Sequence, residues 1–361
     1  MVLTELTADN LRCIEHAELS LHPGRNLIWG SNGSGKTSLL EAMFLLGRGR
    51  SFRTRNSERL VRHGRDRLLV FGRTDAVLQD ERALSHALGI EVDRGEGTRA
   101  RIDAVPVSSL AELSRAFPVQ VIDPEVHKLI EEGGRRRRRW LDWAVFHVEP
   151  QFGEWWLRYG RAVRQRNAAL RAREPTRPWE TELAAWGEKI SEARRSVLEQ
   201  LDPHWRAVVT GLACPAGELQ YHRGWAAQGS LAGALESSRA GDERRGLTQV
   251  GPHRADILIR VAGKPAREVL SRGQQKLMAV ALMLAQMRLL RGLSGASPTL
   301  LLDDPAAELD SAHLRHFVDL IAALDCQLVI TSLQPQTPAF GIPDRVFHVE
   351  QGRLGRYNVA S

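Results

Sequence analysis

The stretch "NLIWGSNGSGKTSLLEAMFLLG", which begins at Asn26, constrains the fold more than any other part of the sequence. An apolar run from Leu27 to Trp29 precedes a glycine-rich turn, and a helical pattern with one apolar face follows it. In this setting the pattern G-x-x-x-x-G-K-[ST] is typical of a phosphate-binding loop. The backbone N–H groups of such a loop surround a triphosphate, and the following helix adds the positive end of its dipole.

We expect this loop to hold ATP through its backbone and two side chains. Lys36 would reach the β- and γ-phosphates, and the Thr37 hydroxyl would bind Mg²⁺. An ordinary glycine turn is the alternative interpretation, and a second motif is needed to decide between them. The predicted nucleotide-binding residues of the loop are Gly30, Ser31, Asn32, Gly33, Ser34, Gly35, Lys36, Thr37 and Ser38.

A second motif, "TLLLDDPAAELD", begins at Thr299. Its apolar run predicts a buried strand, and Asp303 at the end of that strand would hold Mg²⁺ directly or through water. Asp304 is the candidate for polarising the attacking water. Lys36, Asp303 and Asp304 are therefore the predicted catalytic residues. The alternative is that the paired acids only cap the next helix.

A third motif, "LSRGQQKLMAVALMLAQ", begins at Leu270 and predicts a helix with an almost unbroken apolar face. The N-terminus of this helix, with the Ser271 hydroxyl, is a second site for an anion. We expect that site to serve a nucleotide held by another chain. A well-capped core helix is the alternative, but it leaves unexplained why Arg272 and Gly273 stand between the cap and the helix.

The order of predicted elements indicates an α/β fold interrupted by a helical insertion. After residue 150 apolar residues recur at helical spacing in two stretches, and Pro175 and Pro178 break the chain between them. We therefore expect an antiparallel helical hairpin that projects from the main domain. The predicted parts are residues 1–115 and 211–361 for the ATPase domain and residues 116–210 for the helical arm.

The formal charge of +7 and a pI near 9.8 suggest an anionic partner. Between Gly133 and Arg173 eleven arginines stand against three acids, and Trp140 and Trp143 at core spacing indicate an ordered segment. A solvated surface is the alternative to nucleic-acid contact. Because no base-reading motif is present, we expect salt-sensitive binding to phosphates and shape. The predicted DNA-contacting residues of this stretch are Arg135, Arg136, Arg137, Arg158, Arg161 and Arg164.

The remaining sequence features indicate a cytoplasmic protein with no membrane association. Three widely separated cysteines form neither a metal nor a redox motif. The N-terminus lacks the pattern of a secretion signal. The longest apolar segment, residues 277–287, is much shorter than the roughly 20 residues that span a bilayer.

The three motifs, in this order, resemble those of the ABC-type ATPases. "LSRGQ" stands where that superfamily has its LSGGQ signature, and "DDPAAELD" where it has D-E-P-x-x-x-L-D. The resemblance implies an ATPase head with a phosphate loop, an inserted helical arm, and an ATP-dependent homodimer in which each chain completes its partner's site. The residues it assigns to that shared site are Ser271, Gly273, Gln274 and Asp310.

The RecF family is a closer match. The stretches "GSNGSGKTSLLEA", "GRGRSFRT", "RRRRRWLDWAVFHVEP", "RQRNAALR", "GPHRADI", "LSRGQQKL" and "LLLDDPAAELD" all resemble it. The resemblance implies a nucleoid-associated protein that binds double-stranded and gapped DNA and helps load RecA with RecR and RecO. Related SMC proteins have a DNA-responsive arginine just after the first helix, which adds Arg53 and Arg55 to the predicted DNA contacts.

Two departures from the wider ABC pattern bear on the rate of hydrolysis. Asp304 stands where transporters have a longer glutamate, and Thr331 or Ser332 stands where many ABC enzymes have a histidine. We therefore expect a slow, weak, DNA-stimulated ATPase that acts as a switch. A nucleotide-binding subunit of a membrane transporter and a non-hydrolysing, ATP-gated DNA clamp are the alternative functions.

Overall fold

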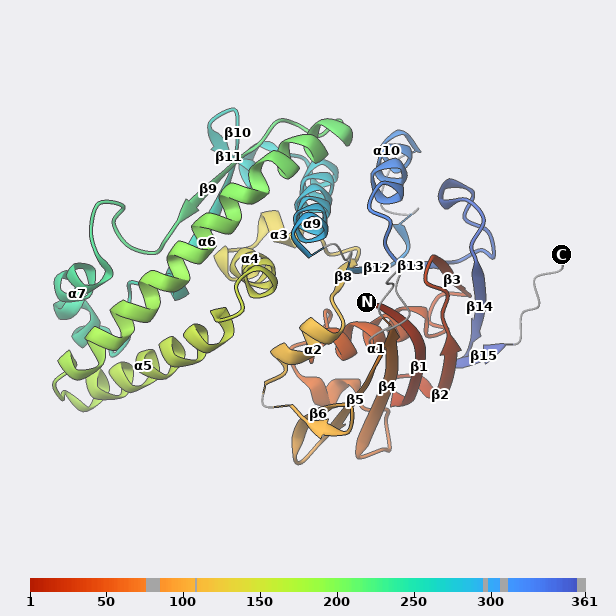
Figure 1. Cartoon of the computed structure of the whole chain (residues 1–361), viewed down its shortest axis with the longest axis horizontal. Helices are drawn as coiled ribbons and strands as arrows, with labels where there is room; N and C mark the ends of the chain where they lie inside the picture. Colours follow the sequence, from red (N-terminus) through yellow and green to blue (C-terminus); the bar gives the residue numbers. More distant parts are fainter. Residues whose placement is uncertain (76–84, 108, 295–297, 306–310, 356–361) are drawn as a thin grey trace. The chain divides into compact units, whose positions relative to one another are not determined.

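The computed structural model describes residues 1–75, 85–107, 109–294, 298–305 and 311–355 (Figure 1). The chain forms two compact units, residues 1–126 with 290–361 (unit 1) and residues 127–289 (unit 2). This division differs from the predicted one, because residues 211–289 pack with the helical hairpin. Within unit 2, the Gln286 amide donates to the Trp140 carbonyl at 2.7 Å. Trp205 donates to the carbonyl of Gly217, beside Met278.

A six-stranded central sheet in unit 1 has the order β15-β14-β3-β13-β12-β8. All neighbours are parallel except β14 and β15, so the carboxyl ends of β3, β12 and β13 meet at one edge. In parallel sheets that edge is where ligands bind. The strands are β3 (Arg25–Trp29), β8 (Val119–Ile122), β12 (Thr299–Leu302), β13 (Leu328–Ser332), β14 (Arg345–Glu350) and β15 (Arg353–Gly355).

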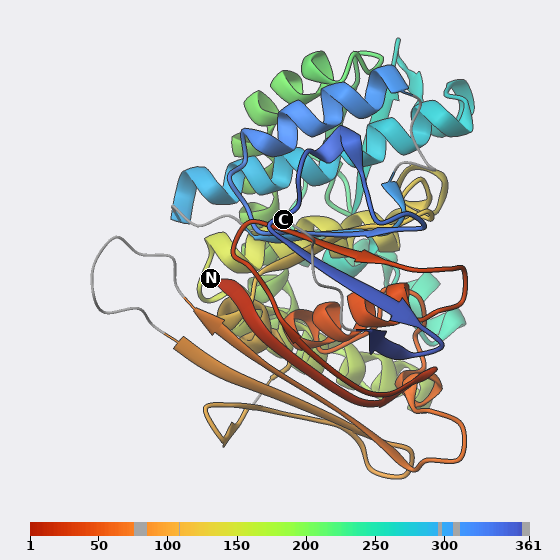
Figure 2. The same cartoon turned by 90° about the vertical axis from the view of Figure 1, so that its right-hand side faces the viewer.

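A second, antiparallel sheet in unit 1 has the order β2-β1-β4-β5-β6-β7, and its long strands run from red to orange in Figure 2. Burial alternates strictly along β4, so one face of this sheet is turned to the core. The strands are β1 (Val2–Leu11), β2 (Ile14–Ser20), β4 (Arg67–Asp75), β5 (Ser85–Asp93), β6 (Gly97–Ile102) and β7 (Val105–Pro106).

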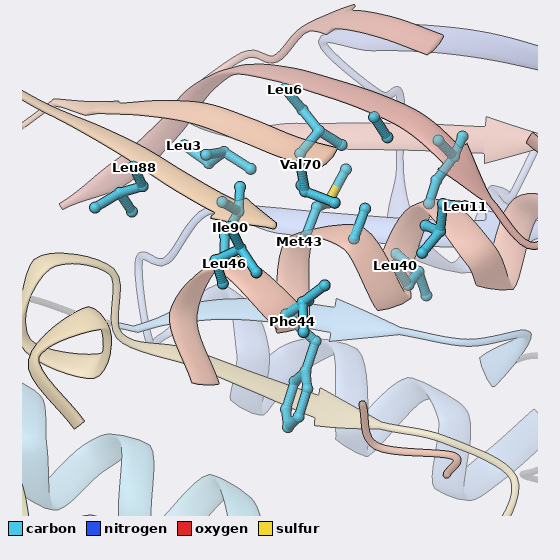
Figure 3. Close-up of a cluster of buried hydrophobic side chains, with 14 of the residues drawn as sticks. Leu3, Leu6, Leu11, Leu40, Met43, Phe44, Leu46, Val70, Leu88 and Ile90 are labelled. Atoms are coloured by element: carbon cyan, nitrogen blue, oxygen red, sulfur yellow. The ribbon is translucent and has the colours of Figure 1, made fainter. Parts of the chain in front are cut away.

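Helix α1 (Lys36–Arg48) is packed between the two sheets. Eleven of its 13 residues are buried. In Figure 3, Leu6, Val70 and Ile90 of the antiparallel sheet point toward Met43 on the helix, whereas Phe44 points to the opposite side. A helix that is apolar almost all round needs such cover on both faces. The phosphate-loop motif therefore begins a rigid, fully enclosed helix.

Shorter elements complete unit 1. The final hairpin turns at Gln351 and Gly352, both with positive φ. Phe317 packs edge-to-face on Phe340 with ring centroids 6.4 Å apart. These elements are η1 (Ser57–Leu60), α2 (Ala111–Ala116), α10 (Ser311–Ala322) and η4 (Pro338–Phe340).

Unit 2 contains the predicted helical hairpin, formed by α5 (Phe152–Ala172) and α6 (Arg177–Gly211) side by side in Figure 1. Pro178 lies in the first turn of α6, where a missing N–H is tolerated. Residues 211–246, which we predicted to belong to the ATPase domain, supply β9 and α7 of this unit. The other elements are α3 (Lys128–Glu131), α4 (Gly134–Val148), β9 (Glu218–His222), α7 (Leu231–Arg245), η2 (Pro252–Arg254), β10 (Asp256–Val261), β11 (Lys264–Pro265), α8 (Ala266–Val269) and α9 (Arg272–Ser294).

A buried arginine joins the hairpin to α7. The Arg166 side chain is fully buried and donates to Asp242 at 2.7 Å and to Thr248 Oγ1 at 3.0 Å. It also reaches Glu180 Oε1 on α6 at 3.1 Å. Asp242 is itself fully buried. Arg166 thus has a structural role, although it belongs to the basic stretch that we associated with DNA.

The "GPHR" segment, which contains η2, contacts both α5 and α6. The Tyr159 hydroxyl lies 2.6 Å from His253 Nδ1, and His253 Nε2 lies 3.0 Å from the Thr248 carbonyl. Burial lowers the pKa of His253 to about 4. The neutral ring therefore donates from Nε2 to the carbonyl and accepts from the tyrosine. Arg194 of α6 donates to the Pro252 carbonyl at 2.7 Å.

We predict that Arg166→Met lowers the free energy of unfolding by about 3–5 kcal/mol, because it leaves the carboxylate of Asp242 buried without its partner. Urea titration of the full chain would measure this change. Arg164→Met on the same helix is the matched control, since Arg164 is exposed, and we expect it to change stability by less than about 0.5 kcal/mol. Equal losses in the two variants would contradict the structural role.

Candidate nucleotide-binding site

The phosphate loop connects the end of β3 to the start of α1, as the sequence predicts. Gly33 and Gly35 have φ values of +76° and +117°, a region that side chains with a Cβ rarely occupy. A Cβ on Gly30 would lie 2.1 Å from the Val349 carbonyl oxygen. The loop therefore requires glycine at these positions, and its residues Ser31 and Asn32 are exposed.

Lys36 and the N-terminus of α1 give the loop a positive charge. Lys36 Nζ donates to the carbonyls of Gly30 at 2.8 Å and Ser31 at 3.0 Å, and a lysine has a third proton to donate. The first turn of α1 has no side-chain cap and no acidic residue. The Ser34 hydroxyl is buried, and no described residue hydrogen-bonds to it. Uncapped N–H groups, an ammonium and an unpartnered hydroxyl fit the phosphates of a nucleotide.

The structure brings Thr37 and Asp303 together although they are 266 positions apart in the sequence. Thr37 Oγ1 donates to both carboxylate oxygens of Asp303, at 3.0 and 3.1 Å. Thr37 follows β3 in the chain, and Asp303 follows β12. These strands lie on either side of β13 in the parallel sheet, and all three end at the same edge, so the two side chains meet there. A hydroxyl and a carboxylate are oxygen ligands that suit Mg²⁺, which usually takes its other ligands from phosphate and water. Among the described residues, no group of three or more His, Cys, Asp or Glu side chains has an arrangement that could hold a metal ion.

Thr331 on β13 fixes the position of both aspartates. Its side-chain oxygen donates to Asp303 Oδ1 at 2.9 Å and accepts from the Asp304 N–H at 2.9 Å. Thr331 is 1% exposed. The sequence named this residue only as the replacement for a histidine. A hydroxyl residue near the end of the apolar run "LVITS" is the signal that could have identified it. Ser332 instead accepts from the Gln334 N–H at 3.1 Å.

Asp304 has a backbone conformation that is uncommon for residues other than glycine. Its φ is +49°, in the left-handed region, two residues after the end of the buried strand β12. Such conformations persist where surrounding contacts enforce them, and they are frequent at functional sites. The hydrogen bond from the Asp304 N–H to Thr331 is one such contact. Asp310, the other predicted residue of this motif, lies outside the described residues.

Ser271 precedes α9 and caps it. The Gln274 N–H donates to Ser271 Oγ at 3.3 Å, and the Ser271 N–H donates to Gln274 Oε1 at 3.0 Å, which together form a capping box. Arg272 and Gly273 are the first helical residues, so the prediction that they stand between the cap and the helix is wrong. All four residues are exposed, and a Cβ on Gly273 would meet nothing within 4 Å. The helix end therefore presents an open surface with a positive dipole.

The predicted DNA-contacting arginines fall into three groups. Arg53 and Arg55 are exposed in the segment after α1. Arg158, Arg161 and Arg164 are exposed along α5, where a spacing of three residues keeps them on one side of the helix. Of the α4 arginines, Arg135 is exposed, and Arg136 is half-buried and paired with Glu132 at 2.6 Å.

Arg137 is buried, and the structure contradicts its assignment as a DNA contact. Its Nε and Nη2 each donate to a carboxylate oxygen of Asp256 at 2.8 Å. Its Nη1 donates to the carbonyls of Ile130 and Glu132 at the end of α3. Five successive arginines on a helix must point in several directions, and Arg137 lies on the face that packs against β10.

Comparison with known proteins identifies the family. The family model for the RecF/RecN/SMC N terminal domain matches residues 2–355. The DNA replication and repair protein RecF of Thioalkalivibrio sulfidiphilus is 39% identical over 360 residues, 98% of this chain and 99% of that protein. The corresponding protein of Chromohalobacter salexigens is 40% identical over 365 residues, with the same shares. The chain belongs to the RecF family.

Solved structures agree with this assignment. The recombination mediator protein RecF-ATP in the RecFOR pathway has a TM-score of 0.88 and 26% identity, covering 99% of this chain and 97% of that one. A head domain of Smc bound to the C-winged helix domain of ScpA has a TM-score of 0.59 and 15% identity, with 100% and 98% coverage, and shares the fold.

The RecF-family chain thus has the predicted fold of an ABC-type ATPase head and belongs to a family of DNA replication and repair proteins. Membership sets aside the alternative of a transporter subunit. Among the described residues, no helix is long and apolar enough to cross a membrane.

We predict that Thr331→Val weakens Mg²⁺-dependent nucleotide binding by about tenfold, because Asp303 loses a hydrogen bond that orients it. Titration with a fluorescent ATP analogue, at several Mg²⁺ concentrations, would measure the effect. Thr331→Ser keeps the hydroxyl and serves as the control, with affinity close to that of the unmodified protein. If valine and serine gave the same affinity, the positioning role of the hydroxyl would be refuted.

Proposed function

We propose that this RecF-family protein is an ATP-dependent DNA-binding protein that acts as a recombination mediator. The observation that carries the proposal is the contact between Thr37 and Asp303, which joins the phosphate loop to the Asp–Asp motif at one sheet edge. The likeness of this chain to the solved structure of RecF-ATP, at 26% identity over nearly the whole chain, supports ATP as the ligand.

In this proposal the nucleotide is held by residues of one chain and enclosed by a second copy. Lys36 binds the β- and γ-phosphates, and Thr37 with Asp303 holds Mg²⁺. When bound, Mg²⁺ neutralises charge on these phosphates. The exposed helix end at Ser271, with Gly273 and Gln274, contacts the γ-phosphate of the partner's nucleotide. Asp310 lies at the same dimer interface by its resemblance to the ABC pattern.

Asp304 is proposed to orient and polarise the water that attacks the γ-phosphate. Its side chain is one methylene shorter than the glutamate of transporters, so it holds that water less closely and turnover is slow. Slow hydrolysis suits a switch, in which the ATP-bound dimer grips DNA and hydrolysis releases it. Stimulation by DNA is part of this proposal.

The proposed DNA is double-stranded or gapped, and contact is with its phosphates. Arg161 and Arg164 support this because both are exposed on α5, where Arg158 is also exposed but is paired with Glu154 at 2.6 Å, and Arg53 with Arg55 adds a second exposed pair. Arg135 and Arg136 are further candidates. Action with RecR and RecO to load RecA, and a cytoplasmic, nucleoid-associated location, complete the proposal, in keeping with the RecFOR pathway of the structural relative.

We predict that Asp304→Asn abolishes phosphate release but preserves or strengthens ATP-driven dimerisation, because the amide keeps the backbone conformation and removes only the negative charge. Phosphate release with gapped DNA and molecular mass by light scattering would measure the two effects.

Ser271→Arg is the comparison variant, since a large cation at the helix end should block closure and abolish dimerisation. If the unmodified protein released no phosphate with DNA present, the non-hydrolysing clamp would be the better description. If ATP left the protein monomeric, the shared site would be refuted.

We predict that replacing Arg161 and Arg164 together by alanine weakens DNA binding equally for all DNA sequences. The plot of the logarithm of the binding constant against the logarithm of the salt concentration should become less steep by about two. Fluorescence anisotropy with gapped duplex at several salt concentrations would measure it. The control is Arg206→Ala on α6, an exposed arginine already paired with Asp202. A slope that did not change would exclude α5 from the DNA interface.

A further inference from the structure

A buried carboxylate on α1 lies one helical turn after Thr37. Glu41 is 0% exposed and accepts from Arg12 Nη2 at 2.9 Å, while Arg12 Nε contacts its second oxygen. Arg12 lies in the turn between β1 and β2. A charge buried this deeply is stable only with close partners, and the two-pronged contact with Arg12 supplies one.

Glu41 also holds the segment that carries Arg53. The Ser51 hydroxyl donates to Glu41 Oε1 and accepts from the backbone N–H groups of Arg53 at 2.9 Å and Thr54 at 3.0 Å. One hydroxyl thereby connects the carboxylate to the backbone of this segment. The position of Arg53 thus depends on α1.

Arg53 is the loosest member of this cluster. Its Nη1 lies 3.8 Å from Glu41 Oε2, and half of its side chain is exposed, against a quarter for Arg12. Two guanidinium groups share one carboxylate, so the cluster has a surplus positive charge at its exposed end. An anion that approaches from solvent can replace Glu41 as the partner of Arg53, while the tighter ion pair between Glu41 and Arg12 stays intact.

Glu41 and Thr37 are both on α1, so a displacement of Glu41 also displaces Thr37. Helix α1 is enclosed on both faces, and packed helices move as rigid bodies more easily than they bend. We propose that Glu41 is a positioning residue that couples contact between Arg53 and a DNA phosphate to the nucleotide site, with Ser51 as the link. This inference rests on the proposed function and adds the route by which DNA regulates hydrolysis.

Ser51→Ala tests the link without leaving a charge buried. At saturating gapped DNA, we expect the basal ATPase rate to be unchanged and the stimulation by DNA to fall by about fivefold or more. Ser51→Thr keeps the hydroxyl and should restore stimulation. Ser57→Ala, in the next element, removes a serine outside the cluster and is the matched control. Equal melting temperatures of the three variants would exclude unfolding as the cause.

A second measurement uses the unmodified protein and needs no substitution. Coupling between two sites is reciprocal, so a non-hydrolysable ATP analogue should change hydrogen exchange at the amides of Arg53 and Thr54 even without DNA. Full stimulation in Ser51→Ala, or no change in exchange, would overturn the proposal. If the unmodified protein itself showed no stimulation by DNA, the proposed function would fail on that point and the coupling with it.

Discussion

The contact of Thr37 with Asp303 is the interaction on which the rest of the site depends. It exists because parallel strands end at a common edge, and because the packing of α1 between two sheets places its first turn at that edge. Thr331 adds a third strand to the same cluster and fixes the carboxylate from the other side. Three segments that are distant in the sequence thus form one rigid oxygen-rich corner, opposite uncapped N–H groups that suit phosphate.

Arginine has two separate uses in this chain. Arg137, Arg166 and Arg194 are buried and paired with aspartates, so they join helices and strands inside unit 2. Such pairs add little net stability compared with apolar packing, but removing one partner is costly, which favours a single arrangement. Exposed arginines such as Arg161 provide the surface charge. The number of arginines in the sequence therefore overstates how many are available to DNA.

The two candidate anion sites at helix ends are built differently. Helix α1 has no side-chain cap, because the backbone of the glycine loop and Lys36 surround the space in front of it. Helix α9 is capped by Ser271 and Gln274, yet these residues are exposed and Gly273 leaves room for a close approach. The first is a preformed cradle, whereas the second is an open helix end, which in the proposed dimer would contact the partner's nucleotide. This difference fits the shared site that we propose.

The phosphate loop, the strand before Asp303, the helix after Ser271 and the helical hairpin could all be predicted from the sequence, because each follows from local spacing of glycine and apolar residues. The tertiary structure decided which of five successive arginines is buried, that Thr331 orients both aspartates, and that Glu41 connects α1 to Arg53. It also decided that residues 211–289 pack with the hairpin. These facts depend on contacts between distant segments, and no local pattern of residue types specifies which distant partner a side chain will meet.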